Sequence, residues 1–240
     1  MPSDLLVAAA AVLAGGVAAL SGFGIGSILT PVFAPALGTK IAVAVVALPH
    51  FLGTVQRLWI LRRHVDRRVL LGFGITSALG GLAGALLHAS SSSRALTLVF
   101  GALLVLAGIS QWTGWMGRIR WGRRAAWVAG AVSGLLGGLV GNQGGIRSAS
   151  MLGFDVPKES FVATATAVAL FVDLARLPVY LVTQGDEIAG AWRLIVVASI
   201  GVVLGTLLGV RFLRDVPEHA FRRVVAAVLV GLGLWMLLGG

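Results

Sequence analysis

Long apolar stretches follow one another along almost the whole chain. Six of them, each of about 19 residues or more, are separated by short polar segments: residues 39–61, 68–88, 95–113, 159–183, 189–211 and 220–239. An apolar helix of about 20 residues is long enough to cross the roughly 30 Å hydrocarbon core of a bilayer. The pattern therefore predicts six membrane-crossing helices.

Two further apolar stretches, residues 5–37 and 125–154, are each interrupted by a glycine-rich break. The breaks are Ser-Gly-Phe-Gly-Ile-Gly-Ser at 21–27 and Gly-Asn-Gln-Gly-Gly-Ile-Arg at 141–147. About ten residues follow each break, and a helix of that length rises only about 15 Å. Each stretch is therefore predicted to form a broken or re-entrant helical hairpin. We expect Pro31 and Pro35 to end the short helix after the first break.

Composition supports a protein embedded in lipid. Hydrophobic residues make up 58% of the 240 and charged residues only 12%, with a mean hydropathy of +0.96. Soluble domains have about 45–50% apolar and about 25% charged residues. The absence of cysteine excludes disulfides and thiolate metal sites. We expect no cofactor, no resident metal and, despite the net charge of +10, no nucleic-acid partner.

The basic residues predict the topology, because short cytoplasmic loops are enriched in Arg and Lys. Thirteen of the nineteen fall into one set of loops: Arg62, Arg63, Arg67, Arg68, Arg118, Arg120, Arg123, Arg124, Lys158, Arg211, Arg214, Arg222 and Arg223. If these loops are cytoplasmic, the first hairpin enters the membrane from outside and the second from inside. Both termini are then expected on the outer side.

This topology divides the chain into two halves of opposite orientation. Residues 1–117 and 118–240 each comprise one hairpin and three crossings within a single membrane domain. Aligning Gly22 with Gly141 also aligns Gly26 with Gly145. The predicted fold is an all-α integral membrane protein of two inverted repeats, the plan of secondary transporters whose sites lie at the midplane between the repeats.

The second break carries the polar residues that favour an anion. Arg147 follows two amide side chains, Asn142 and Gln143, and the glycines Gly144 and Gly145. A cation at membrane depth is costly, so Arg147 requires a partner or a ligand. Exposed helix N-terminal N–H groups also favour negative charge. The alternative is that Arg147 lies at the cytoplasmic surface and binds lipid phosphate. From the first break, Gly22, Gly24 and Gly26 complete the candidate substrate site.

Two crossing helices contribute further candidates. Asp173 and Arg176 are three residues apart and share a helix face, which Thr166 extends. The pair is either a structural ion pair, or a site in which Arg176 binds the anion and Asp173 orients it or carries a proton. His50 lies at the centre of its helix. It either couples transport to protons or is a hydrogen-bonded packing residue.

Enzymatic motifs are absent from the sequence. It contains no HExxH, no Walker A motif and no G-x-S-x-G elbow, so we do not expect an enzyme. The small number of acidic residues argues against a cation pathway, which Asp or Glu usually surround.

Both breaks and their surroundings resemble the TauE/SafE sulfite exporter family, also called the 4-toluene sulfonate uptake permease family. The resemblance depends on residues 21–27 with Pro31, on residues 133–148, on Phe161-Val-Ala-Thr164 and on Val172-Asp-Leu-Ala-Arg-Leu-Pro-Val-Tyr180. Residues 25–27 and Asn142-Gln143 depart from the usual glycine pattern of the family. The resemblance implies transport of sulfite or an organosulfonate across a bacterial inner membrane.

These observations favour a secondary transporter for a small anion that works by alternating access. An anion channel and an accessory membrane protein without transport remain as alternatives, because a re-entrant hairpin lined with N–H groups serves a channel equally well. The expected partners are a small sulfur-containing anion, the lipid bilayer and further copies of the chain in a small homo-oligomer.

Overall fold

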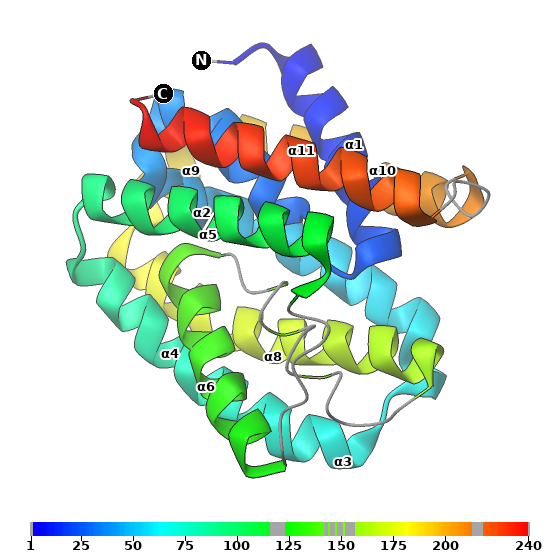
Figure 1. Cartoon of the computed structure of the whole chain (residues 1–240). Helices are drawn as coiled ribbons and strands as arrows, with labels where there is room; N and C mark the ends of the chain where they lie inside the picture. Colours follow the sequence, from blue (N-terminus) through cyan, green and yellow to red (C-terminus); the bar gives the residue numbers. More distant parts are fainter. Residues whose placement is uncertain are drawn as a thin grey trace.

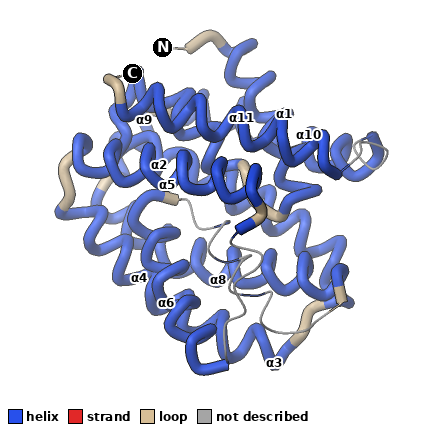
Figure 2. The backbone as a smooth tube through the Cα atoms, in the orientation of Figure 1, coloured by secondary structure: helices blue, strands red, loops and turns tan. Residues whose placement is uncertain are grey.

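The computed structural model of the chain describes residues 2–115, 123–141, 144, 147, 151, 157–212 and 218–239. These residues form helices joined by short loops, and no strand occurs among them (Figure 2). Six of the described helical segments are long and apolar enough to cross a membrane. The structure thus confirms an all-α membrane protein.

The first half begins with helix α1 (Asp4–Ser21) and helix α2 (Ile25–Leu61). Gly38 interrupts α2 with a φ of 74° and so separates a short helix from the first predicted crossing. Pro31 and Pro35 lie inside that short helix and do not end it, contrary to the sequence-based expectation. The reason is that membrane helices tolerate proline where neighbours satisfy the freed carbonyls, whereas a positive φ cannot continue a helix.

Most of the remaining helices correspond to predicted crossings, but the short helix of residues 185–190 was not predicted. Helix α3 (Arg67–Val69) continues through a π-helical turn (Leu70–Gly74) into α4 (Ile75–Ser90), and α5 (Ser93–Thr113) follows. The second half has the helices α6 (Arg123–Val140), α8 (Lys158–Thr183), α9 (Gly185–Gly190), α10 (Trp192–Phe212) and α11 (Glu218–Leu237). Helix α6 is the first arm of the second hairpin, and most of the second arm lies outside the described residues.

The helices pack in three close pairs: α1 with α10, α4 with α6, and α5 with α11 (Figure 1). Small residues allow this approach. A Cβ added to Gly80 or Gly84 would overlap the backbone of α6, and one added to Gly205 would overlap Val12 in α1. Because lipid tails are themselves apolar, close backbone packing of this kind is a main source of stability between membrane helices.

Polar contacts gather the helix ends into two groups. At one end the Nζ of Lys40 donates to the carbonyl of Ala89 at 2.6 Å, and Arg193 pairs with Asp4 at 2.7 Å. At the other end the backbone N–H of Asp66 donates to Thr164 at 2.8 Å. This grouping agrees with the topology that the basic residues predict. Which group faces the cytoplasm stays a prediction from charge.

Candidate functional site

The two glycine breaks lie against each other. A Cβ added to Gly26 would lie 2.6 Å from the carbonyl oxygen of Gly141, and one added to Gly144 would overlap the side chain of Phe23. Arg147 also crosses between the breaks, since its Nη2 donates to the carbonyl of Gly22 at 3.0 Å. Segments about 120 residues apart in the sequence are therefore brought together.

Both breaks begin with a glycine in a left-handed conformation. Gly22 ends α1 with a φ of 77°, and Gly141 follows α6 with a φ of 71°. Each N–H donates to the carbonyl four residues earlier, Ala18 and Gly137 respectively, at 3.0 Å. A residue with a Cβ is strained in this conformation. Gly24, with a φ of 136°, completes the turn into the short helix of α2.

Arg147 lies in the protein interior. Its relative exposure is 2%, which excludes the alternative of a cytoplasmic surface position. Its Nη2 bonds to Gly22, whereas its Nε and Nη1 are buried with no hydrogen-bond partner among the described residues. A buried charged donor without a partner is costly. The neighbouring candidates Asn142, Gln143 and Gly145 lie outside the described residues.

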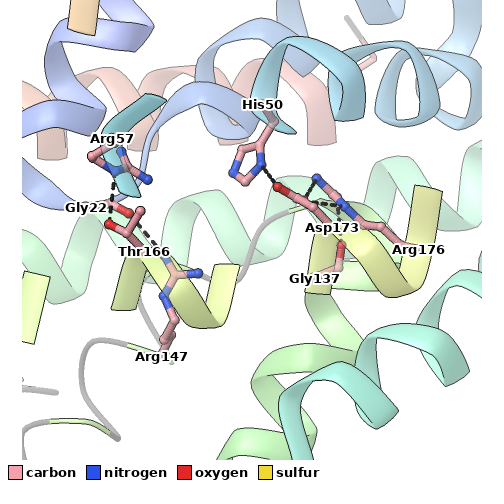
Figure 3. A network of polar contacts seen from close by, with 8 residues as sticks. All are labelled: Gly22, His50, Arg57, Gly137, Arg147, Thr166, Asp173 and Arg176. Atoms are coloured by element: carbon pink, nitrogen blue, oxygen red, sulfur yellow. Dashed lines mark hydrogen bonds and ion pairs between the residues drawn. The ribbon is translucent and has the colours of Figure 1, made fainter. Parts of the chain in front are cut away.

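A second group of polar contacts connects α2, α6 and α8 (Figure 3). Oδ1 of Asp173 accepts from Nε of Arg176 at 2.9 Å and lies 2.8 Å from its Nη2. Oδ2 of the same carboxylate lies 2.7 Å from Nδ1 of His50. The Nη1 of Arg176 donates to the carbonyl of Gly137 at 2.9 Å. Asp173 thus neutralises Arg176 and holds its guanidinium against the end of α6.

Arg57 belongs to the same interior, and the sequence-based list of site residues omits it. Its Nη1 donates to the carbonyl of Ala18 at 2.7 Å. Its Nε donates to Oγ1 of Thr166 at 3.1 Å (Figure 3). The available signal was spacing: Arg57 and Arg176 are 119 residues apart, the same interval as Gly22 and Gly141.

The charges of this interior do not balance. Among the described residues, the buried charged side chains are Arg57, Arg147, Asp173 and Arg176. The one carboxylate pairs with Arg176, and no carboxylate of the described residues forms an ion pair with Arg57 or Arg147. Two guanidinium groups therefore lie near the end of α1 with only neutral acceptors (Figure 3). Arginine in this state is suited to bind an oxyanion.

The described residues contain no group of three or more His, Cys, Asp or Glu side chains that could hold a metal ion. The polar atoms of the site are those of guanidinium, imidazole, carboxylate and hydroxyl groups and of glycine-rich backbone. This set can bind and orient an anion and can exchange a proton at His50 or Asp173.

These features define a multi-pass membrane protein whose interior holds a cluster of buried arginines between two helix breaks. The chain belongs to the sulfite exporter TauE/SafE family, a family of membrane transporters, whose model matches residues 7–236. The resemblance noted from the sequence is thereby confirmed over nearly the full chain. Comparisons with curated proteins and with solved structures found no match.

Proposed function

We propose that this protein is a secondary transporter that moves sulfite or an organosulfonate across the inner membrane of a bacterium. The observation that carries the proposal is the excess of buried positive charge: three arginines against one aspartate among the described residues. An isolated charge at membrane depth is costly. An anionic substrate would compensate it during transport.

Arg147 is the central ligand in this proposal. Its two buried nitrogens without a described partner supply the donors, and its bond to Gly22 fixes its position between the breaks. Guanidinium groups bind oxyanions through paired N–H donors, and the three oxygens of sulfite or a sulfonate suit this geometry. The glycines of both breaks bring backbone groups close to the same point.

The transport cycle is proposed to follow alternating access by two inverted repeats, residues 1–117 and 118–240. The packing supports this division, because each pair joins the two halves in a matching way: α1 of the first half lies on α10 of the second, α6 of the second half lies on α4 of the first, and α5 pairs with α11. In transporters of this plan, one repeat moves against the other around a fixed central site.

Proton coupling is proposed to involve His50 and Asp173. Their 2.7 Å contact joins the two crossings that face each other at the centre of the molecule, α2 and α8. A buried histidine and carboxylate can exchange a proton as the surrounding helices rearrange. We also propose that both termini face the outer side and that the chain forms a small homo-oligomer.

Reconstituted protein tests the proposal. Proteoliposomes preloaded with sulfite or methanesulfonate should release the anion faster than protein-free liposomes loaded with the same anion. Arg147→Gln should reduce the initial rate of release at least tenfold. Arg193→Gln is the matched control, because Arg193 is exposed and pairs with Asp4 at the molecular surface. If neither anion leaves the proteoliposomes faster than it leaves the protein-free liposomes, the proposed function is contradicted. Unitary currents in a planar bilayer would identify a channel instead.

A further inference from the structure

The two buried arginines of the crossing helices make the same contact in the two halves of the chain. Arg57 donates from Nη1 to the carbonyl of Ala18, and Arg176 donates from Nη1 to the carbonyl of Gly137. Each acceptor is the carbonyl that also receives the N–H of the glycine ending the hairpin helix, Gly22 or Gly141.

The correspondence is residue by residue. Ala18 and Gly137, Gly22 and Gly141, and Arg57 and Arg176 are each separated by 119 residues. The packing of the hairpin helices follows the same interval, because Gly15 of α1 and Gly134 of α6 are also 119 residues apart. A Cβ added to Gly134 would overlap the carbonyl of Ser77, and a Cβ added to Gly15 would overlap the carbonyl of Val202. The surroundings of Arg176 therefore indicate what the surroundings of Arg57 accommodate.

One position breaks the equivalence. Asp173 lies three residues before Arg176 and pairs with it through two contacts of 2.8 and 2.9 Å. The equivalent residue, three positions before Arg57, is Thr54. Thr54 is 0% exposed, and its Oγ1 has no hydrogen-bond partner among the described residues. The second half thus supplies its own anion to its arginine. In the first half a neutral threonine stands at the equivalent position, and the Nε of Arg57 donates to the hydroxyl of Thr166 instead of to a carboxylate.

We propose that the oxyanion of the substrate binds at Arg57 in the position that the carboxylate of Asp173 takes at Arg176. Thr54 donates its hydroxyl to the anion, and Arg147, which binds the same end of α1, contributes the second guanidinium. Arg176 is then a positioning residue that its own aspartate already neutralises. This inference builds on the proposed function and assigns the oxyanion to the first half of the chain.

Capping of α1 does not by itself account for these side chains. Arg57 and Arg147 bond to the last carbonyls of α1, which carry partial negative charge. Neutral carbonyls cannot balance two buried full charges. Capping also leaves three buried polar atoms, Thr54 Oγ1 and Arg147 Nε and Nη1, without partners in the described part of the chain. An oxyanion bound at this point supplies both the charge and the acceptors.

Two variants of Thr54 test the inference by titration calorimetry and thermal unfolding of purified protein. Thr54→Val keeps the shape and removes the hydroxyl, so it should lower sulfite affinity about tenfold while leaving the unliganded protein at least as stable. Thr54→Asp should pair with Arg57 as Asp173 pairs with Arg176. It should raise the unfolding temperature of the unliganded protein and abolish sulfite binding, a loss of at least a hundredfold.

Thr206 provides the matched controls. Its hydroxyl is also buried and has no partner in the described part of the chain, but it lies where α10 packs on α1, beside Gly15. Thr206→Val should leave sulfite affinity unchanged, and Thr206→Asp should destabilise the protein because no arginine receives the carboxylate. Wild-type sulfite affinity in Thr54→Val would overturn the inference, even if Thr54→Asp cannot be purified. If wild-type protein binds or transports neither sulfite nor methanesulfonate, the proposed function fails instead.

Discussion

At the scale of single residues, the interior is governed by the cost of placing charge away from water. Asp173 and Arg176 offset each other and are at most 2% exposed. Removing one partner of such a pair leaves an uncompensated buried charge, and this usually costs about 3–5 kcal/mol. The loss reflects the remaining group more than the intrinsic strength of the pair.

We therefore expect Asp173→Asn to lower the free energy of unfolding by about 3–5 kcal/mol, measured by denaturant titration of the purified protein. Arg176 and His50 would both lose the carboxylate that they contact. Asp186→Asn, which changes an exposed carboxylate, should stay within about 0.5 kcal/mol of wild type. Equal effects of the two substitutions would contradict the assigned role of Asp173.

At the scale of helices, glycine sets how closely the elements approach. Gly134 of α6 faces the Ser77 carbonyl of α4 so closely that any Cβ there would overlap it. A Cβ added to Gly231 of α11 would meet no described atom of another helix within 4 Å, so this position has open space. Two glycines in helix interiors thus have opposite roles in packing.

Gly134→Ala should lower the free energy of unfolding by about 1–3 kcal/mol, the usual cost of overpacking. Gly231→Ala should raise it by up to about 1 kcal/mol, because alanine favours the helix and meets no neighbour. Thermal unfolding in detergent, compared in one series, measures both. The same sign of change in the two variants would show that close packing of α4 on α6 does not limit stability.

At the scale of the whole molecule, the orientation in the membrane follows from the basic loops. The absence of cysteine makes single-cysteine labelling direct. His64 and Asp186 are both exposed. His64 lies between α2 and α3, near the Asp66–Thr164 contact at one end of the bundle, and Asp186 lies in α9, near the Asp4–Arg193 contact at the other end.

In intact cells, a membrane-impermeant maleimide should label Asp186→Cys, whereas His64→Cys should react only after the membrane is permeabilised. The reason is that the loop of His64 carries four arginines, which favour the cytoplasmic side. Labelling of His64→Cys in intact cells would reverse the orientation. Labelling of both in intact cells would contradict a topology with these loops on opposite sides.

The sequence was sufficient to predict the long helices and the meeting of the two breaks, but not the short helix α9 or the π-helical turn at Leu70–Gly74. Apolar length gave the crossings, and the glycines at 22 and 141 marked the hairpin turns. It was insufficient at Pro31 and Pro35, where the helix does not end but continues to Gly38. It also placed Asp173 and Arg176 on one face, but left open whether the pair was structural or a site.

Hydrophobic periodicity, glycine and charge bias are local properties of the chain, so they alone determined a polytopic helical protein with two interrupted segments. Which arginines keep an unbalanced charge depends on what each meets across the interface between the halves. Only the tertiary structure decided that Asp173 neutralises Arg176, that Arg57 donates to the neutral hydroxyl of Thr166, and that Arg147 is buried beside Gly22. The contacts of Arg57 and Arg147 join residues 39 to 125 positions apart, and no local pattern encodes such pairings.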